Sequence, residues 1–386
     1  MFPKNPKEFK GRRFYCKCGK THSFETDIVL GKNILPREFS KDTLIICDSN
    51  TLECAKDIKA KKFVIGKGVE NADIKYVYQI IDNTPKDIAA LAALGSGTIC
   101  DITRYAAHLS QKDFVALATA PSMDGYLSVV SPIVFENYIK RSMPSKAPTK
   151  AYCDIDILTA APMRLILAGL GDVLGKFTSL IDWKIANLVE DCYYCPEIAN
   201  LVNYAVELCY QNSQGLKDRD HKCVMALIDA LLLCGIAMNM AGFSRPASGA
   251  EHTLAHYFEI EVLKNRAYGY HGEFVGIGML IYARMLDMFF AQKPNMPSKK
   301  FEKFMDNWHA LKDEVASLNE RLEQIESAME HVGCKTKPSE IGIDEKALAK
   351  ALLTVQPSAP KYTSITLFRD FGKDKELINK YIEKYL

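Results

Sequence analysis

Several features that would place this chain at a membrane or on nucleic acid are missing from its sequence. The 386 residues carry 49 Lys and Arg against 47 Asp and Glu, a formal net charge of +2, so no excess of one sign attracts nucleic acid or an anionic membrane. The basic N-terminus contains no apolar segment followed by a cleavage site, and nowhere do about 18 apolar residues follow one another. We therefore expect a cytoplasmic protein without a membrane span, whose partner is a small molecule and not nucleic acid.

The sequence also lacks internal repeats and a compact cysteine framework. Its 12 cysteines are scattered along the chain, which is typical of buried thiols in a reducing compartment rather than of disulfide bridges. A chain of this length exceeds the roughly 250 to 300 residues at which single hydrophobic cores stop growing, so two domains are expected.

The first 155 residues alternate short apolar, β-branched runs with helical patterns. Strands are expected at residues 26–30, 43–48, 62–66, 91–94 and 113–118, and helices at residues 50–60 and 98–110. Such an alternation predicts a parallel sheet with helices on its faces. We therefore expect an α/β, Rossmann-like nucleotide-binding domain over residues 1–155.

Residues 156–386 show helical patterns only. The first long amphipathic segment, residues 161–188, carries a proline where a helix would begin. Further along, one apolar seam has spacings of three and four, formed by Trp308, Leu311, Val315, Leu318, Leu322, Ile325 and Met329. Such a seam packs against its own domain or forms an intermolecular coiled coil, and we favour the first. These patterns predict an all-α second domain over residues 156–386.

Three motifs of the first domain stand where a dinucleotide would bind, although the complete G-x-G-x-x-G fingerprint is absent. Gly95-Ser96-Gly97 lies between an expected strand and helix, where it either exposes N–H groups to a pyrophosphate or makes an ordinary tight turn. Asp48 ends a strand and would either bind a ribose hydroxyl, which favours NAD over NADP, or cap the next helix. The loop at residues 119–126 follows a strand at the sheet edge where ligands bind, and ordinary loop chemistry explains it equally well.

One carboxylate and several imidazoles stand in apolar surroundings in the second domain. Asp172 follows GLG, His252 and His256 belong to SRPASGAEHTLAH, and His271 begins HGE. A divalent metal would satisfy such groups, which are costly to bury alone. His252 and His256 share a helix face, so they form either a zinc-binding pair or one ligand beside one substrate-facing group. Three hydrogen-bonded core histidines are the alternative, and their grouping with Asp172 favours the metal.

Two cysteine motifs invite a metal interpretation that remains incomplete in the sequence. Cys16, Cys18 and His22 supply three ligands and no fourth, so a turn with free thiols is the favoured interpretation. Cys192 and Cys195 have a CxxC-like spacing without a second half, and we interpret them as buried or incidental thiols.

Taken together, five segments resemble, in order, the motifs of the sn-glycerol-1-phosphate dehydrogenase family: GSGTICDITRYAA, TAPSMDGYLS, APMRLILAGLGDVLGK, SRPASGAEHTLAH and HGEFVGIGML. That family belongs to the superfamily of iron-containing alcohol dehydrogenases, glycerol dehydrogenases and dehydroquinate synthases. The resemblance covers about residues 26–280 and implies a Rossmann-like domain, a helical domain and an active site between them. The implied reaction is the reversible, metal-assisted reduction of dihydroxyacetone phosphate to sn-glycerol-1-phosphate by NADH or NADPH, which would supply glycerophospholipid-type synthesis.

The resemblance also implies roles for individual residues. Asp172, His252 and His271 match the metal ligands, while Asp124, His256 and Asp172 match substrate contacts. His256 would hydrogen-bond a substrate hydroxyl or relay a proton, and Arg245 and Lys176 are our candidates for binding the phosphate. The cofactor contacts that the resemblance implies are Asp48, Gly97, Thr98, Ile99, Cys100, Asp101, Thr119, Ala120, Pro121, Ser122 and Ser128.

Some properties stay open at this stage. Ser96 stands where the superfamily usually has a glycine, while the CxCGxxH start and the long C-terminal extension are similar to bacterial members, associated with nickel where archaeal members use zinc. A site of one carboxylate and two imidazoles suits either metal. A homodimer is implied by the resemblance alone. The alternatives are a polyol or glycerol dehydrogenase of the same superfamily, a dehydroquinate-synthase-like lyase, and a non-catalytic dinucleotide- or metal-sensing protein.

Overall fold

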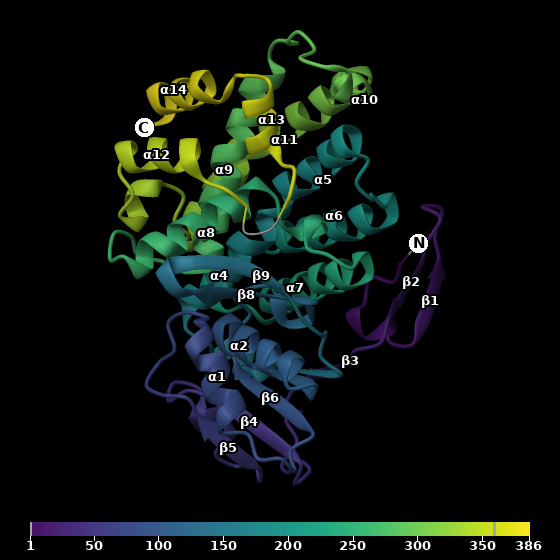
Figure 1. Ribbon diagram of the computed structural model, residues 1–386, viewed down its shortest axis with the longest axis vertical. Helices are drawn as coiled ribbons and strands as arrows, with labels where there is room; N and C mark the ends of the chain where they lie inside the picture. Colours follow the sequence, from purple (N-terminus) through teal and green to yellow (C-terminus); the bar gives the residue numbers. More distant parts are fainter. Residues whose placement is uncertain (1, 358–359) are drawn as a thin grey trace.

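A computed structural model describes residues 2–357 and 360–386, and its first part is built on a six-stranded parallel sheet of order β3-β10-β7-β6-β4-β5 (Figure 1). The central strands are continuous apolar runs because both faces of the sheet are covered. The expected parallel sheet is therefore confirmed. Its strands are β3 (Asp27–Gly31), β4 (Thr43–Cys47), β5 (Lys61–Val64), β6 (Ala90–Gly95), β7 (Asp113–Ala118) and β10 (Lys150–Asp154).

The two faces of the sheet are covered differently. On one face lie α1 (Ile74–Asp82) and α2 (Gly97–Leu109), which belong to the main hydrophobic core. On the other face a smaller cluster contains Ile45, Ala92 and Leu117 of the sheet with Ala55 and Ile58 of the loop after β4. The helix expected at residues 98–110 is thus confirmed as α2.

The prediction of a helix at residues 50–60 is wrong. This segment forms only the 3₁₀ turn η2 (Leu52–Ala55). The carboxylate of Asp48 accepts hydrogen bonds from the backbone N–H groups of Asn50 and Thr51, and the Thr51 hydroxyl donates to the carbonyl of Leu94. Such local side-chain bonds compete with helical hydrogen bonds and hold the chain in a turn.

Two antiparallel hairpins and one parallel strand were not expected from the sequence. The hairpin of β1 (Arg12–Tyr15) and β2 (Thr21–Phe24) precedes the sheet, and that of β8 (Val130–Phe135) and β9 (Ile139–Pro144) follows the loop after β7. Strand β10 pairs with β3 and β7 and so lies inside the sheet. Figure 1 places β1 and β2 beside the helical half rather than beside the sheet.

In the described part of the chain no strand follows β10, and the remaining residues form a helical body, as expected. The segment expected at residues 161–188 is two helices that meet at Gly175, the first starting directly after Pro162. The helices are α3 (Ile155–Ala160), α4 (Met163–Leu174), α5 (Lys176–Glu190), α6 (Pro196–Gln211), α7 (His221–Ala241), α8 (Ala250–Leu263), α9 (His271–Phe290), α10 (Glu302–Asp306), α11 (Trp308–Val332), α12 (Glu345–Thr354), α13 (Ser364–Asp370) and α14 (Asp374–Tyr385).

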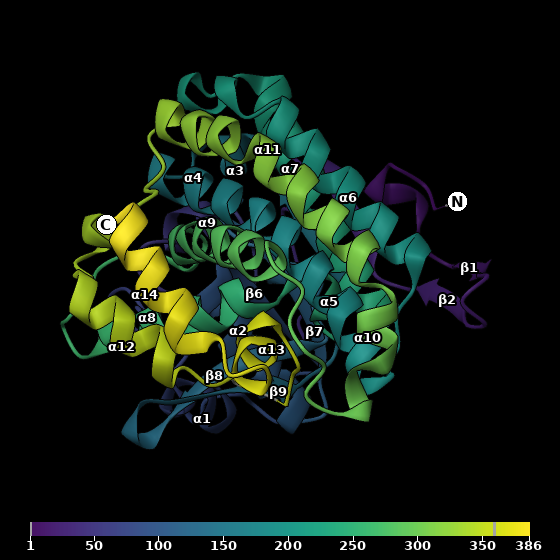
Figure 2. The same ribbon diagram turned by 90° about the horizontal axis from the view of Figure 1, so that it is seen from above.

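Two of these helices have an apolar pattern that could also face another chain or a membrane. The apolar seam of α11 is buried within the chain's own helical body, from Trp308 to Met329, which favours internal packing over an intermolecular coil. Helix α7 is the one described helix with the length and apolar composition to cross a membrane, but 78% of its most apolar window is buried inside the protein. Figure 2 shows α7 among the other helices, as expected of a core helix.

Glycines let α4 approach its neighbours closely enough to form the site described below. A Cβ at Gly169 would lie 1.9 Å from the carbonyl oxygen of Pro121, and one at Gly171 would lie 2.3 Å from that of Gly272. A Cβ at Gly272 would lie 1.8 Å from the carbonyl oxygen of Ala168. The backbone of α4 therefore touches both the loop after β7 and the first turn of α9.

We expect Gly272→Ala to destabilise the protein by about 3 kcal/mol or more, although alanine normally stabilises a helix by up to about 1 kcal/mol over glycine. The added methyl group must push α9 away from rigid α4 backbone. Urea unfolding of the unmodified protein and of the Gly272→Ala variant measures the change in the free energy of unfolding. Gly242→Ala, at a position with φ of +80° and nothing within 4 Å of the new Cβ, is the control and should cost only about 1 kcal/mol. Equal losses in the two variants would contradict the close-packing argument.

Candidate functional site

A cleft of about 1790 Å³ lies between the carboxyl edge of the sheet and the helical body. Pockets for single small molecules are typically about 300 to 1,000 Å³, so this cleft has room for a dinucleotide and a substrate together. Thirteen of the sixteen site residues expected from the sequence line it: Asp48, Gly97, Thr98, Ile99, Asp101, Thr119, Ala120, Ser122, Asp124, Ser128, His252, His256 and His271.

The remaining three expected residues lie behind the wall of the cleft. Cys100 is buried on α2 with its sulfur 3.5 Å from Nη2 of Arg104, and the carbonyl of Pro121 packs against Gly169. Any contact of these two with a cofactor would come from the backbone. Asp172 is fully buried beneath the cleft-lining His252.

The first turn of α2 faces the cleft at the carboxyl end of β6. Ser96 is the N-cap residue, and no side chain of the described residues caps this turn. The first N–H groups of a helix have no partner within it and carry its positive dipole end. Gly97, Thr98 and Ile99 therefore present an anion-binding turn of the kind that holds a pyrophosphate.

Asp48 does more than the sequence indicated. Its carboxylate caps the turn after β4 and also accepts the backbone N–H of Val69, at 3.2 Å. The helix that Asp48 was expected to cap does not form: the carboxylate instead caps the turn at Asn50 and Thr51, and Thr51 is the N-cap residue of η2. The side chain also lines the cleft, so a contact with a cofactor ribose stays a prediction. In that case one carboxylate would bind the ribose hydroxyl as well as the backbone of two loops.

Sequence reasoning missed Arg104, which holds the loop after β7 against α2. Its fully buried guanidinium lies 2.8 Å from Asp101 and donates hydrogen bonds to the carbonyls of Val130 and Gly125. Burial raises the pKa of Asp101 to about 6, although Arg104 opposes this rise. This arginine therefore joins the expected pyrophosphate turn to the loop that carries Asp124 and Ser128.

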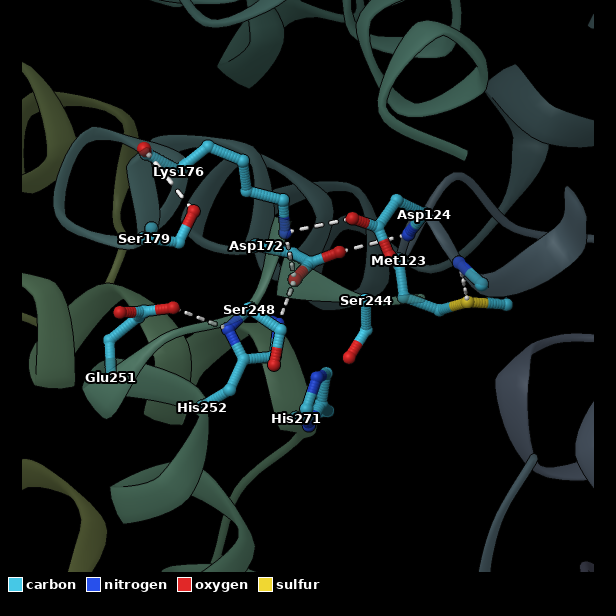
Figure 3. A network of polar contacts seen from close by, with 12 residues as sticks. Met123, Asp124, Asp172, Lys176, Ser179, Ser244, Ser248, Glu251, His252 and His271 are labelled. Carbon is cyan, nitrogen blue, oxygen red and sulfur yellow. Dashed lines mark hydrogen bonds and ion pairs between the residues drawn. The ribbon is translucent and has the colours of Figure 1, made fainter. Parts of the chain in front are cut away.

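The helical side of the cleft brings the expected metal ligands together. One donor atom each from Asp172, His252 and His271 lies within 4.8 Å of the others, and Nε2 of His252 is 3.3 Å from Oδ1 of Asp172. Figure 3 shows these side chains converging from α4, α8 and the start of α9. The first turn of α9 places His271 there because Gly272 packs directly on α4.

Each imidazole is oriented by a carboxylate. Nδ1 of His252 is 2.8 Å from Glu251, and Nδ1 of His271 is 3.1 Å from Glu259. If both Nδ1 atoms carry the proton, the Nε2 lone pairs are free for a metal, and such carboxylate–histidine pairs are the usual support of metal-binding imidazoles.

The electrostatics of this region also suit a divalent cation. Among the described residues, the carboxylates of Asp124, Asp172 and Glu259 form ion pairs with the ammonium groups of Lys176 and Lys140, and Glu251 faces the imidazole of His252. Four acidic side chains thus gather negative charge in a largely buried place, which a cation would help to stabilise. The donor set and this charge both fit a divalent metal.

His256 lies beside this group without belonging to it. Its ring stacks on His271 at 5.7 Å between centroids, and it lines the cleft. Burial, together with the positive charge of Lys140, lowers the pKa of His256 well below its usual value. His256 is therefore a neutral hydrogen-bond partner at neutral pH, and less suited to act as a charged acid.

Our two candidates for binding a phosphate are contradicted. Lys176 is fully buried, with its ammonium 2.8 Å from Asp172 and 2.9 Å from Asp124, so it holds two carboxylates together. Arg245 donates to the carbonyl of Tyr362 at 3.1 Å and does not line the cleft. The sequence places Lys176 and Arg245 near the motifs, but it does not show that Lys176 pairs with both Asp172 and Asp124 or that Arg245 binds the carbonyl of Tyr362.

The C-terminal extension supports the site from behind, which the sequence did not reveal. The ammonium of Lys361 donates to the hydroxyls of Ser244 and Ser248, two residues that line the cleft. Asp182 accepts the backbone N–H groups of Ala250 and Ser364, each at 2.7 Å. A single carboxylate thus caps α8, which carries His252, and α13 of the extension.

Comparisons with known proteins give relatives of this chain and solved structures with the same fold. Residues 31–162 match the family described as iron-containing alcohol dehydrogenase. The chain is 34% identical over 289 residues to a glycerol-1-phosphate dehydrogenase (NAD(P)+) of Geobacillus thermodenitrificans, covering 73% of this chain and 71% of that protein. It is 32% identical over 374 residues to the protein of the same name from Halalkalibacterium halodurans, covering 87% and 92%. A solved structure of a probable glycerol dehydrogenase from Sinorhizobium meliloti shares the fold, with a TM-score of 0.65 at 14% identity over 92% of this chain and 97% of that one.

Proposed function

The chain belongs to the family of glycerol-1-phosphate dehydrogenases, and we propose that it reduces dihydroxyacetone phosphate to sn-glycerol-1-phosphate with NADH or NADPH in the cleft between its two parts. In this proposal residues 1–155 bind the cofactor, and residues 156–386 hold the metal and the substrate. The observation that carries it is the convergence of one buried carboxylate and two carboxylate-oriented imidazoles beside a cleft of dinucleotide size.

Asp172, His252 and His271 would hold the divalent metal. When bound, this metal supplies Lewis-acid polarisation of the ketone and stabilises negative charge on its oxygen. Nickel and zinc both suit one carboxylate and two imidazoles, and reconstitution of metal-free protein with each ion separates them. Glu251 and Glu259 keep the two imidazoles in place, and Lys176 keeps Asp172 and Asp124 side by side.

The chain's own residues place the reactants. The first turn of α2 would bind the pyrophosphate of the cofactor, and the loop from Thr119 to Ser128 would contact its nicotinamide end. When bound, the cofactor would supply the hydride for the carbonyl carbon, and solvent would supply the proton for the oxygen. His256, neutral at this pH, would donate or accept a hydrogen bond at the single hydroxyl of the ketone substrate, and Asp124 would help to orient the same hydroxyl.

Lys140 is the cation that we assign to the substrate phosphate. It lines the cleft, it forms an ion pair with Glu259, and its charge acts on His256. An ammonium in this position would offset the phosphate charge next to the reacting ketone. The homodimer and the cytoplasmic location belong to the same proposal and rest on the family resemblance and the charge balance of the sequence.

The test compares dihydroxyacetone phosphate with dihydroxyacetone as substrates of the metal-reconstituted protein, followed by NADH and NADPH oxidation. We expect kcat/KM to be at least about 100-fold higher for the phosphorylated ketone, a difference of about 2.7 kcal/mol. Lys140→Ala should lose most of this preference, with a smaller fall in the rate with dihydroxyacetone because Lys140 also pairs with Glu259, which orients His271. A preference for the unphosphorylated ketone would indicate a polyol dehydrogenase, and cofactor binding without turnover of either ketone would indicate a sensor.

A further inference from the structure

A second cluster of metal-ligating side chains lies away from the cleft. Cys16 and Cys18 lie in the turn between β1 and β2, His22 lies in β2, and Cys195 immediately precedes α6. One donor atom of each lies within 4.8 Å of the others. The fourth ligand that the N-terminal motif lacks is thus supplied by a residue more than 170 positions away.

The spacing of these atoms is that of a tetrahedral zinc site. Zinc–sulfur bonds of about 2.3 Å and zinc–nitrogen bonds of about 2.0 Å place two sulfurs about 3.8 Å apart and a sulfur and a nitrogen about 3.6 Å apart. The two sulfurs of Cys16 and Cys195 are 3.5 Å apart. Nε2 of His22 lies 3.4 Å from the sulfur of Cys18 and 3.6 Å from that of Cys195.

The backbone around the cluster is arranged for metal ligands. Gly19 has a φ of +85°, which turns the chain directly after Cys18, and the backbone N–H of Lys20 is directed at the Cys18 sulfur. Nδ1 of His22 is 3.2 Å from the carbonyl of Met240, and a hydrogen bond there requires the proton on Nδ1. Nε2 then offers its lone pair to the centre of the cluster, in the way that metal-binding imidazoles are usually supported.

The cluster is largely closed off from solvent. Cys195 is completely buried and His22 is 2% exposed. The Cys18 sulfur lies 3.2 Å from the Tyr193 hydroxyl, and the ammonium of Lys20 lies 3.6 Å from the centre of the Tyr193 ring. A metal ion at the centre of the cluster would therefore be shielded from water, as in structural sites.

We propose that Cys16, Cys18, His22 and Cys195 form a structural zinc site that is separate from the active-site metal. Four protein ligands fill a tetrahedral zinc ion and leave no open position, which is the rule for structural and not for catalytic zinc. A disulfide between Cys16 and Cys195 would use two of the four residues and leave Cys18 and His22 without a role. Three sulfurs and one imidazole also select zinc over oxygen-preferring cations.

Such a site would fasten the first hairpin to the helical body. The hairpin has only two short strands, which are marginal alone, and it contacts α7 near Met240. The chain continues from α7 through Ser244 and Ser248 of the cleft to His252. The zinc ion would therefore hold the segment that enters the active-site wall, without touching substrate or cofactor.

Metal analysis of the full-length protein tests the proposal. We expect about one zinc ion per chain that survives dialysis, is retained by His252→Ala and is lost in Cys16→Ser and Cys195→Ser. Cys192→Ser is the matched control, since this cysteine lies three residues away and outside the cluster, and it should retain the ion. Equal zinc contents of Cys195→Ser and Cys192→Ser would overturn the proposal.

Two measurements on the unmodified protein remain decisive if the variants fail to fold. Cobalt in place of zinc should show sulfur-to-metal charge-transfer absorption. Cys16, Cys18 and Cys195 should resist alkylation until a strong chelator is added, while Cys54, which lies outside the cluster, reacts at the same rate with and without chelator. A Cys16–Cys195 disulfide in non-reducing peptide maps, or chelator-independent alkylation, would overturn the proposal.

Discussion

Replacing either His252 or His271 by alanine is expected to remove the active-site metal and to lower kcat/KM by more than about 100-fold. Each substitution takes away one of three ligands, and even the loss of a residue that only orients a ligand typically costs about 10- to 100-fold. Both imidazoles lie at the surface of the cleft rather than inside the core, so the variants should remain folded. Metal content by mass spectrometry and kcat/KM after reconstitution with nickel or zinc measure the effect.

Two further variants separate the ligands from their surroundings. His256→Ala should lower turnover and leave the metal content unchanged, since His256 stacks on His271 without joining Asp172. Glu251→Gln should bind metal more weakly and lose about 10- to 100-fold in activity, because the amide holds Nδ1 of His252 less firmly than the carboxylate does. Full activity and unchanged metal content in His252→Ala would refute the ligand assignment.

Two of the correctly predicted strands can be recognised from their own residues. Residues 43–47 and 113–118 carry apolar runs that identify buried strands without help from the rest of the chain. Strand β10 has no such run, because Lys150 and Tyr152 alternate with small residues. It forms a strand because it pairs with β3 on one side and β7 on the other. This pairing depends on distant parts of the chain and cannot be predicted from the residues of β10 alone.

The same distinction applies to the site. Asp172, His252 and His271 could be grouped from the sequence because family motifs surround each of them. Glu259 carried a usable signal that was overlooked, since it follows His256 by three residues on the same helix face. The pairings of Lys176 with Asp172 and of Arg104 with Asp101 also have a local signal, since the partners are four and three residues apart. The contacts of Lys176 with Asp124, of Arg104 with Val130 and of Lys361 with Ser248 have none, because these partners lie far apart in the sequence and only the fold brings them together.

The handedness of the substrate is the second large effect that we expect. Three attachments would fix the ketone in the proposed site: its carbonyl group beside Asp172, His252 and His271, its single hydroxyl at His256 and Asp124, and its phosphate at Lys140. A substrate held at three points would present only one face of its carbonyl to the hydride that the cofactor supplies.

In the oxidation direction the enzyme should therefore accept sn-glycerol-1-phosphate and discriminate against sn-glycerol-3-phosphate by at least about 100-fold in kcat/KM, a difference of about 2.7 kcal/mol in transition-state binding. If sn-glycerol-3-phosphate bound its phosphate and its terminal hydroxyl in the same places, the hydrogen on its central carbon would point away from the cofactor. Reduction of NAD or NADP by each pure enantiomer measures the ratio. Comparable rates with both would mean that fewer than three attachments hold the substrate, and a higher rate with glycerol would place the chain among the polyol dehydrogenases.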